Sequence, residues 1–112
     1  MGVGTVDEEV LIEFAITALL DEKQEPRTIV ASLVQRWPDA PPLSLLYILS
    51  MAAGGVEQML SSPDIQVRAQ EMWRLTGLVG VDLYTMHCMG LPQDSSADLY
   101  NFWRAHDPFF LT

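Results

Sequence analysis

The sequence predicts an all-α fold, a compact five-helix bundle in a single domain (residues 1–112) with a long, largely apolar fourth helix. Three observations predict it. Apolar residues recur at helical spacing, and no stretch alternates apolar with polar residues as a half-buried strand would. Prolines and capping residues stand where helices should begin and end. Apolar residues make up 49% of the chain, which is enough to bury a core. We expect helices at about residues 6–21, 27–37, 42–61, 63–90 and 96–106.

The first three helices are placed by the residues at their ends. Thr5 and Glu8 have the spacing of a capping box, which starts the first helix. Pro26 suits the first turn of the second helix, and Pro38 ends that helix by excluding the preceding residue from helical geometry. The expected core face of the second helix is Ile29, Val30, Leu33, Val34 and Trp37. Pro41–Pro42 can open the third helix, because their missing N–H groups would have no partner there anyway.

The fourth helix carries the longest apolar stretch. Ser62–Asp64 supplies a capping serine, a proline and an acid that suits the N-terminal end of the helix dipole. From Leu75 to Gly90 the only formal charge is Asp82, so this part of the helix must be buried in the domain's own core or against another subunit. Ser95 followed by Asp98 starts the fifth helix. We expect the first, third and fourth helices to form the apolar centre.

Two helices carry small residues at positions where they could touch. Ser50–Gly55 lies in the third helix, and Gly77 and Gly80 lie in the fourth. Small side chains let helix backbones approach closely, so we expect these patches to cross each other, or one of them to cross its own copy at a two-fold axis. Replacing Gly77 or Gly80 with Leu should then destabilise the fold by a few kcal/mol through overpacking.

The chain is strongly acidic. Fifteen acidic residues against six basic ones give a formal net charge of −9. Such a surface repels phosphate, which argues against binding to nucleic acid or to an anionic membrane. The best membrane candidate, residues 43–56, is shorter than the roughly 20 residues that a span requires. Lys23 is the only base in the first 25 positions, so this region is either a solvated surface or a docking face for a basic protein partner.

The cysteine content and the start of the chain favour the cytoplasm. Cys88 is the only cysteine, so the chain has no internal disulfide and suits a reducing compartment. Acidic residues stand where a signal peptide would be basic and then apolar. We expect Cys88 to be an inert buried thiol, because it lies in an apolar helix. Five of the six basic residues are Arg, a bias typical of GC-rich genomes, which favours a bacterial source.

The pattern of residues on one face of the fourth helix predicts a slot for a flat or acyl-like apolar ligand. The residues that share this face at helical spacing are Trp73, Gly77, Gly80, Tyr84 and His87. The glycines would form the floor of the slot, and Trp73 and Tyr84 would form its walls. The alternative interpretation is a glycine groove that receives a neighbouring helix.

Three residues are candidates for acid–base chemistry: Asp82, Glu57 and His87. A carboxylate among the apolar neighbours of Asp82 needs a donor or a cation, or else takes up a proton, and a raised pKa suits an acid or base. The alternative for Asp82 is an exposed seam or an arginine partner. The arginines considered are Arg36, Arg74 and Arg104.

Metal and cofactor binding have little support in the sequence. Met86–Met89 contains three types of soft ligand, but consecutive residues of a helix point in different directions. We expect no metal site, no cofactor and no catalytic residue. The methionines are interpreted as pliable core filler, namely Met51, Met59, Met72, Met86 and Met89.

The absence of catalytic motifs favours a non-enzymatic protein-interaction or regulatory module that forms a homodimer through its fourth helix. A hydrophobic-ligand binder using the slot is the second hypothesis, and an enzyme using the three acid–base candidates is the third. The apolar tail Phe109–Leu111 either folds back or enters a groove on another protein. The expected interface residues are Leu75, Leu78, Val79, Asp82, Met86, Met89, Phe109 and Phe110.

Overall fold

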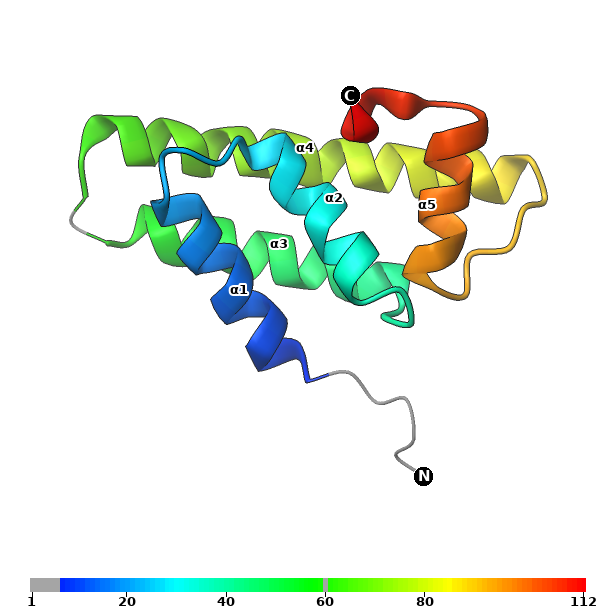
Figure 1. Cartoon of the computed structure of the whole chain (residues 1–112), viewed down its shortest axis with the longest axis horizontal. Coiled ribbons are helices and arrows are strands. Elements are labelled where there is room, and N and C mark those ends of the chain that lie inside the picture. The colour runs from blue at the N-terminus through cyan, green and yellow to red at the C-terminus, as the bar shows by residue number, and fades with distance from the viewer. Residues whose placement is uncertain (1–6, 60) are drawn as a thin grey trace.

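The computed structural model describes residues 7–59 and 61–112, and its architecture is the all-α bundle that the sequence predicts (Figure 1). Within these residues the elements are α1 Glu8–Leu20, α2 Pro26–Arg36, α3 Pro42–Glu57, α4 Pro63–Cys88, α5 Ser96–Ala105 and a final 3-10 turn, η1, Pro108–Leu111. The longest helix is α4, with 26 residues. None of the helices described here combines the length and the hydropathy that crossing a membrane requires.

Most helix starts follow the predicted caps. Ser62 caps α4 and Ser95 caps α5, each by accepting a hydrogen bond from the backbone N–H three residues further on. The cap at Ser95 is part of a complete capping box. The start of α1 differs from the prediction, because Asp7 is the N-cap and its carboxylate accepts a hydrogen bond from the Glu9 N–H at 3.0 Å. The predicted cap at Thr5 lies outside the described residues.

Two helices end more than one residue earlier than predicted. The last residue of α3 is Glu57, four residues before the expected end. The last residue of α4 is Cys88, because Gly90 adopts a positive φ of 71° and reverses the chain. The Leu91 N–H then donates to the carbonyl of Met86 at 2.9 Å, which is the closing bond of a Schellman motif.

The helices form two layers. In Figure 1, α3 and α4 lie side by side and antiparallel, and α1, α2 and α5 cross in front of them. The shortest dimension of the molecule is 20 Å, which corresponds to two helices of about 10 Å diameter each. The core lies between the layers, and α3 packs most extensively on α4 and α1. Fully buried side chains come from all five helices, among them Leu11, Leu33, Leu49, Leu75 and Trp103.

The small-residue patches of α3 and α4 do not cross each other, which corrects the prediction. A Cβ atom added at Gly54 on α3 would meet the ring of Trp73 at 3.7 Å, so the space above this glycine is taken by an aromatic side chain. At Gly77 and Gly80, no described atom lies within 4 Å of an added Cβ. A leucine at either position therefore does not overpack the folded chain.

The C-terminal tail folds back onto the domain, which is one of the two outcomes expected from the sequence. The ring centroids of Trp103 and Phe110 lie 4.6 Å apart. The guanidinium of Arg27, on α2, lies 5.1 Å from the ring centroid of Phe109. The tail thus closes the second layer by packing on both α5 and α2.

Candidate functional site

Large apolar side chains are exposed along the side of α3 and α4 that is opposite the other three helices. Between 41% and 74% of each of these residues is exposed. The buried side of α4, which holds Leu75 and Val79, faces the core on the opposite side of the helix. We call the exposed surface the outer face, and its large apolar residues are Leu43, Tyr47 and Met51 on α3 and Trp73, Val81 and Tyr84 on α4.

The middle of the outer face exposes no formal charge, and the exposed carboxylate of Glu57 lies at its Trp73 end. Residues 42–56 include neither acid nor base, and residues 75–88 include only Asp82. Asp82 is 7% exposed and lies on the core side of α4. The net charge of −9 is therefore carried by other surfaces. A group of large exposed apolar side chains on one side of a protein is typical of an interaction site.

Trp73 joins the two helices of the outer face. Its ring lies against Gly54 of α3, where an added Cβ would be in van der Waals contact with the ring at 3.7 Å. Its indole N–H donates to Oε1 of Glu57 at 2.8 Å, at the edge of the face. The ring is therefore held in one orientation while part of it stays exposed. Rigid aromatic side chains make good interface anchors, since they lose little conformational entropy on binding.

The predicted slot residues lie on the surface without enclosing a slot. Trp73, Gly77, Gly80 and Tyr84 follow one another along the outer face, and His87 is exposed beyond them. The ring centroids of Tyr84 and His87 are 6.5 Å apart. Because no described atom stands over either glycine, the α4 backbone is open to an approaching molecule between the two aromatic residues.

The predicted interface residues divide between the core and the surface. Buried in the chain's own core are Leu75, Val79, Asp82, Met86 and Phe110. Leu78 and Phe109 are partly buried and pack against the core, and Met89 is exposed. These burials correct the expectation that this side of α4 forms an interface. The apolar run enters the domain's own core, and its opposite side contributes to the outer face.

Several sulfur-containing side chains that were expected in the core are exposed. The Cys88 thiol is exposed, which corrects the prediction of an inert buried thiol. Of the five methionines interpreted as core filler, only two are buried, Met72 and Met86, and three are exposed, Met51, Met59 and Met89. Both α3 and the second half of α4 carry apolar residues on two sides, so helical spacing alone does not identify the buried side.

Asp82 is a buried carboxylate that accepts a hydrogen bond from a buried tryptophan. The Trp103 Nε1–H donates to Oδ2 of Asp82 at 2.9 Å. Burial raises the pKa of Asp82 above its ordinary value, the hydrogen bond from Trp103 opposes this rise, and the negative charge of Asp107 adds to it. The partner is thus an indole on α5, and the expected exposed seam or arginine partner is corrected.

The three acid–base candidates do not form a common site. Glu57 is bonded to Trp73, and Asp82 is bonded to Trp103. Trp73 and Asp82 are nine residues apart on α4, which corresponds to roughly 13 Å along the helix axis. His87 is exposed at the end of the same helix. Over residues 7–59 and 61–112, no group of three His, Cys, Asp or Glu side chains is placed to hold a metal ion.

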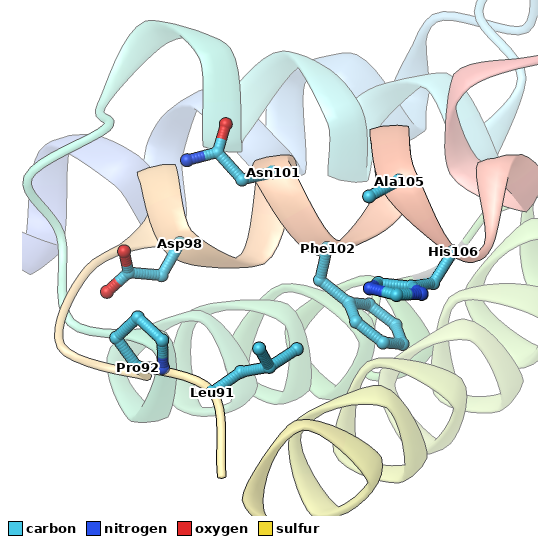
Figure 2. A pocket seen from close by; sticks show the side chains of 7 residues that line it. All are labelled: Leu91, Pro92, Asp98, Asn101, Phe102, Ala105 and His106. Atoms are coloured by element: carbon cyan, nitrogen blue, oxygen red, sulfur yellow. The ribbon is translucent and has the colours of Figure 1, made fainter. Parts of the chain in front are cut away.

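A small pocket lies between α5 and the loop that follows α4 (Figure 2). It has a volume of about 210 Å³ and is lined by Leu91, Pro92, Asp98, Asn101, Phe102, Ala105 and His106. The ring centroids of Phe102 and His106 lie 5.4 Å apart. The Asp98 carboxylate already accepts two backbone hydrogen bonds at the start of α5. The pocket is smaller than the roughly 300–1,000 Å³ of typical ligand sites, and no sequence motif marks its residues.

No protein-family model matches the chain, no curated protein matches its sequence, and no solved structure matches its fold. Function has therefore to be inferred from the chain's own surface. The outer face of α3 and α4 is the feature of that surface with the clearest physical meaning, because it leaves apolar area in water on a protein with a net charge of −9.

Proposed function

We propose that this protein is a non-enzymatic protein-interaction module and that its outer face docks against another protein surface. The observation that carries the proposal is an apolar face that extends over two helices of a chain with a net charge of −9 and exposes no formal charge within residues 42–56 and 75–88. Covering this face removes apolar area from water, which is worth about 25 cal/mol per Å². Within residues 42–56 and 75–88, no exposed carboxylate or ammonium group loses its hydration in the process.

The shape of the outer face favours a helical partner surface. Two antiparallel helices present parallel ridges of side chains, with Leu43, Tyr47 and Met51 on one ridge and Trp73 and Tyr84 on the other. Helices pack by placing the ridges of one in the grooves of another. The open backbone around Gly77 and Gly80 supplies such a groove within the α4 ridge.

A small hydrophobic ligand suits this surface less well. Ligand sites typically enclose 70–90% of a ligand's surface, whereas Trp73 and Tyr84 are separated along α4 with open space above the glycines between them. A flat ligand on this floor would keep one side in water. The surface of a partner protein covers the two glycines without leaving an apolar side in water.

Photo-crosslinking in the cells that produce the protein tests the proposal. A photoreactive phenylalanine analogue placed at Tyr47 or Tyr84 should link the chain to a protein, because both positions lie on the outer face. The same analogue at Val10, an exposed apolar residue on α1, is the matched control and should give no adduct. Equal labelling at Val10, or no protein adduct at either tyrosine position, would contradict the proposal.

A further inference from the structure

We infer that the occupant of the outer face is a second copy of this chain, placed by a two-fold axis that sets α4 antiparallel to α4 of the partner subunit. The inference rests on the proposed function and names the partner for the same surface. Its structural basis is the order of side chains along α4, the open space above the two glycines, the absence of charge and the size of the face.

The spacing of residues along the outer face of α4 suits a two-fold contact. Trp73, Gly77, Gly80 and Tyr84 are separated by four, three and four residues, so they are symmetric about the midpoint between Leu78 and Val79. A two-fold interface pairs each residue with the one at the same distance on the other side of the axis. With the axis at this midpoint, each Trp73 meets Tyr84 of the partner subunit, and each Gly77 meets Gly80 of the partner subunit.

The glycines allow the two α4 backbones to approach closely at the axis. No described atom lies within 4 Å of a Cβ built at Gly77 or Gly80, so this space is free for the partner. Helix axes normally pack about 8–10 Å apart, and glycines on both sides of a contact permit the short end of that range. The aromatic residues at either end then pair across the contact and bury large apolar areas.

On the described surface of α3 and α4, the charge distribution favours contact with a second copy only at the outer face. Two chains that each carry −9 repel each other wherever acidic surfaces meet. The outer face brings together residues 42–56 and the exposed side of residues 75–88, where no formal charge is exposed. Like charges are therefore not opposed in the centre of the contact.

The size of the face is sufficient for a weak, specific dimer. With 16 residues in α3, at ~1.5 Å per residue, the two helices overlap over about 24 Å. Two adjacent helices are about 20 Å wide, so the face covers roughly 500 Å² and a pair of copies buries roughly 1,000 Å². This is the lower limit for a specific interface.

Sedimentation equilibrium of the full chain from about 1 to 200 µM tests the dimer. We expect a reversible dimer, and Gly77→Leu should weaken it about 100-fold, because a branched side chain from each copy separates the backbones. The helical circular dichroism of this variant should not change, since the space above Gly77 is open in the single chain. Val67→Leu is the control: Val67 is 62% exposed on α4, outside the stripe of Trp73 and Gly77, and the dimer should persist. A monomeric wild type over the whole range would overturn the inference.

The arrangement is tested by crosslinking between copies. A photoreactive analogue at Tyr84 in a mixture of unlabelled and ¹⁵N-labelled chains should link to the tryptic peptide 69–74 of the other copy, which contains Trp73. Within one chain the two positions are eleven residues apart on α4, roughly 16 Å, beyond the reach of the reagent. A link to a different peptide would overturn the two-fold arrangement. A monomeric chain that crosslinks only to another protein in cells would overturn the second copy and leave the proposed function standing, whereas no adduct at all would contradict both.

Discussion

At the scale of single residues, the buried pair of Asp82 and Trp103 determines a pH dependence of stability. The ordinary pKa of an aspartate is 3.8, and burial raises the pKa of Asp82 in the folded chain. The folded state therefore keeps its proton at pH values where the unfolded chain has released it. Stability due to this group is highest below pH 3.8 and falls as the pH rises through the folded pKa.

The variant Asp82→Asn makes this dependence measurable, because the amide does not titrate. We expect the unfolding free energy of the wild type, relative to Asp82→Asn, to fall as the pH rises from below 3.8 and to level off above the folded pKa. Urea unfolding of both proteins over a pH series gives this difference, in which all other titrating groups cancel. A difference that stays constant, or that grows in favour of the wild type as the pH rises, would contradict the burial argument.

The hydrogen bond from Trp103 should matter more than a similar bond at the surface. Trp103→Phe removes the only indole donor at the buried Asp82 carboxylate among the described contacts and should destabilise the fold by about 2 kcal/mol. Trp73→Phe removes an equivalent donor from the exposed Glu57 and should cost less than about 1 kcal/mol. Thermal or urea unfolding of the two variants compares them directly. Equal losses of stability in the two variants would show that burial of Asp82 does not increase the contribution of its hydrogen bond.

For these residues, the sequence predicted that a hydrogen-bond partner was required, but it did not predict which residue supplies it. The apolar neighbours of Asp82 indicated that it required a donor or a proton, and the structure shows both a donor and a raised pKa. The donor itself was missed because Trp103 is 21 residues away on another helix. The contact of Trp73 with Gly54 was missed for the same reason, since side-chain pairing between helices leaves no local pattern.

At the scale of helices, the Arg68 side chain of α4 caps the C-terminal end of α1. Its Nε donates to the carbonyl of Leu19 at 2.7 Å, and its Nη2 donates to the carbonyls of Ala18 and Asp21 at 3.1 and 2.9 Å. The last turn of α1 has no basic residue of its own. The guanidinium thus satisfies carbonyls that a helix end leaves without partners, and it lies at the negative end of the helix dipole.

We expect Arg68→Ala to destabilise the protein by about 2 kcal/mol, because three carbonyl groups lose a charged donor at once. Arg68→Lys should recover only part of this loss, since an ammonium group lacks the planar fork. Arg74→Ala, which removes a surface pair with Glu71, is the control and should cost at most about 1 kcal/mol. Urea unfolding measures the three variants, and hydrogen exchange should show the amides of α1 losing protection first in Arg68→Ala. Unchanged hydrogen-exchange protection of the α1 amides in Arg68→Ala would contradict the capping role.

Helix starts were more predictable than helix ends, for a physical reason. Starts depend on local signals, and the proline at position 26 and the caps at Ser62 and Ser95 are visible in the sequence. The end of α3 has no such marker, because the residues after Glu57 could continue a helix as far as the cap of α4. The helix α4 ends two residues before Gly90, because a Schellman motif places its glycine beyond the last helical residue.

At the scale of the whole molecule, the two-layer arrangement explains why one surface remains apolar. The layer of α1, α2 and α5 covers one side of α3 and α4, and the described chain has no further helix for the other side. The sequence indicated that the apolar stretch of the fourth helix must be buried in the domain's own core or against another subunit. It could not indicate which side of α4 would be buried, because the stretch from Leu75 to Gly90 is apolar on both sides, and only the packing of the layers decides between them.

If a second copy covers the outer face, the thermal stability of the protein depends on its concentration. Association stabilises the native chain by mass action, so the Tm of the wild type should rise by roughly 5–10 °C over a 100-fold increase in concentration. Tyr84→Glu should abolish this rise, because it places carboxylates into the contact, and should preserve the Tm of the dilute chain, because Tyr84 is 69% exposed. Val67→Glu adds the same charge to another side of α4 and should keep the rise. Calorimetry over that range measures both quantities in one experiment. A wild-type Tm that is independent of concentration would mean that the outer face stays uncovered by its own copy, and the partner would then have to be a different protein.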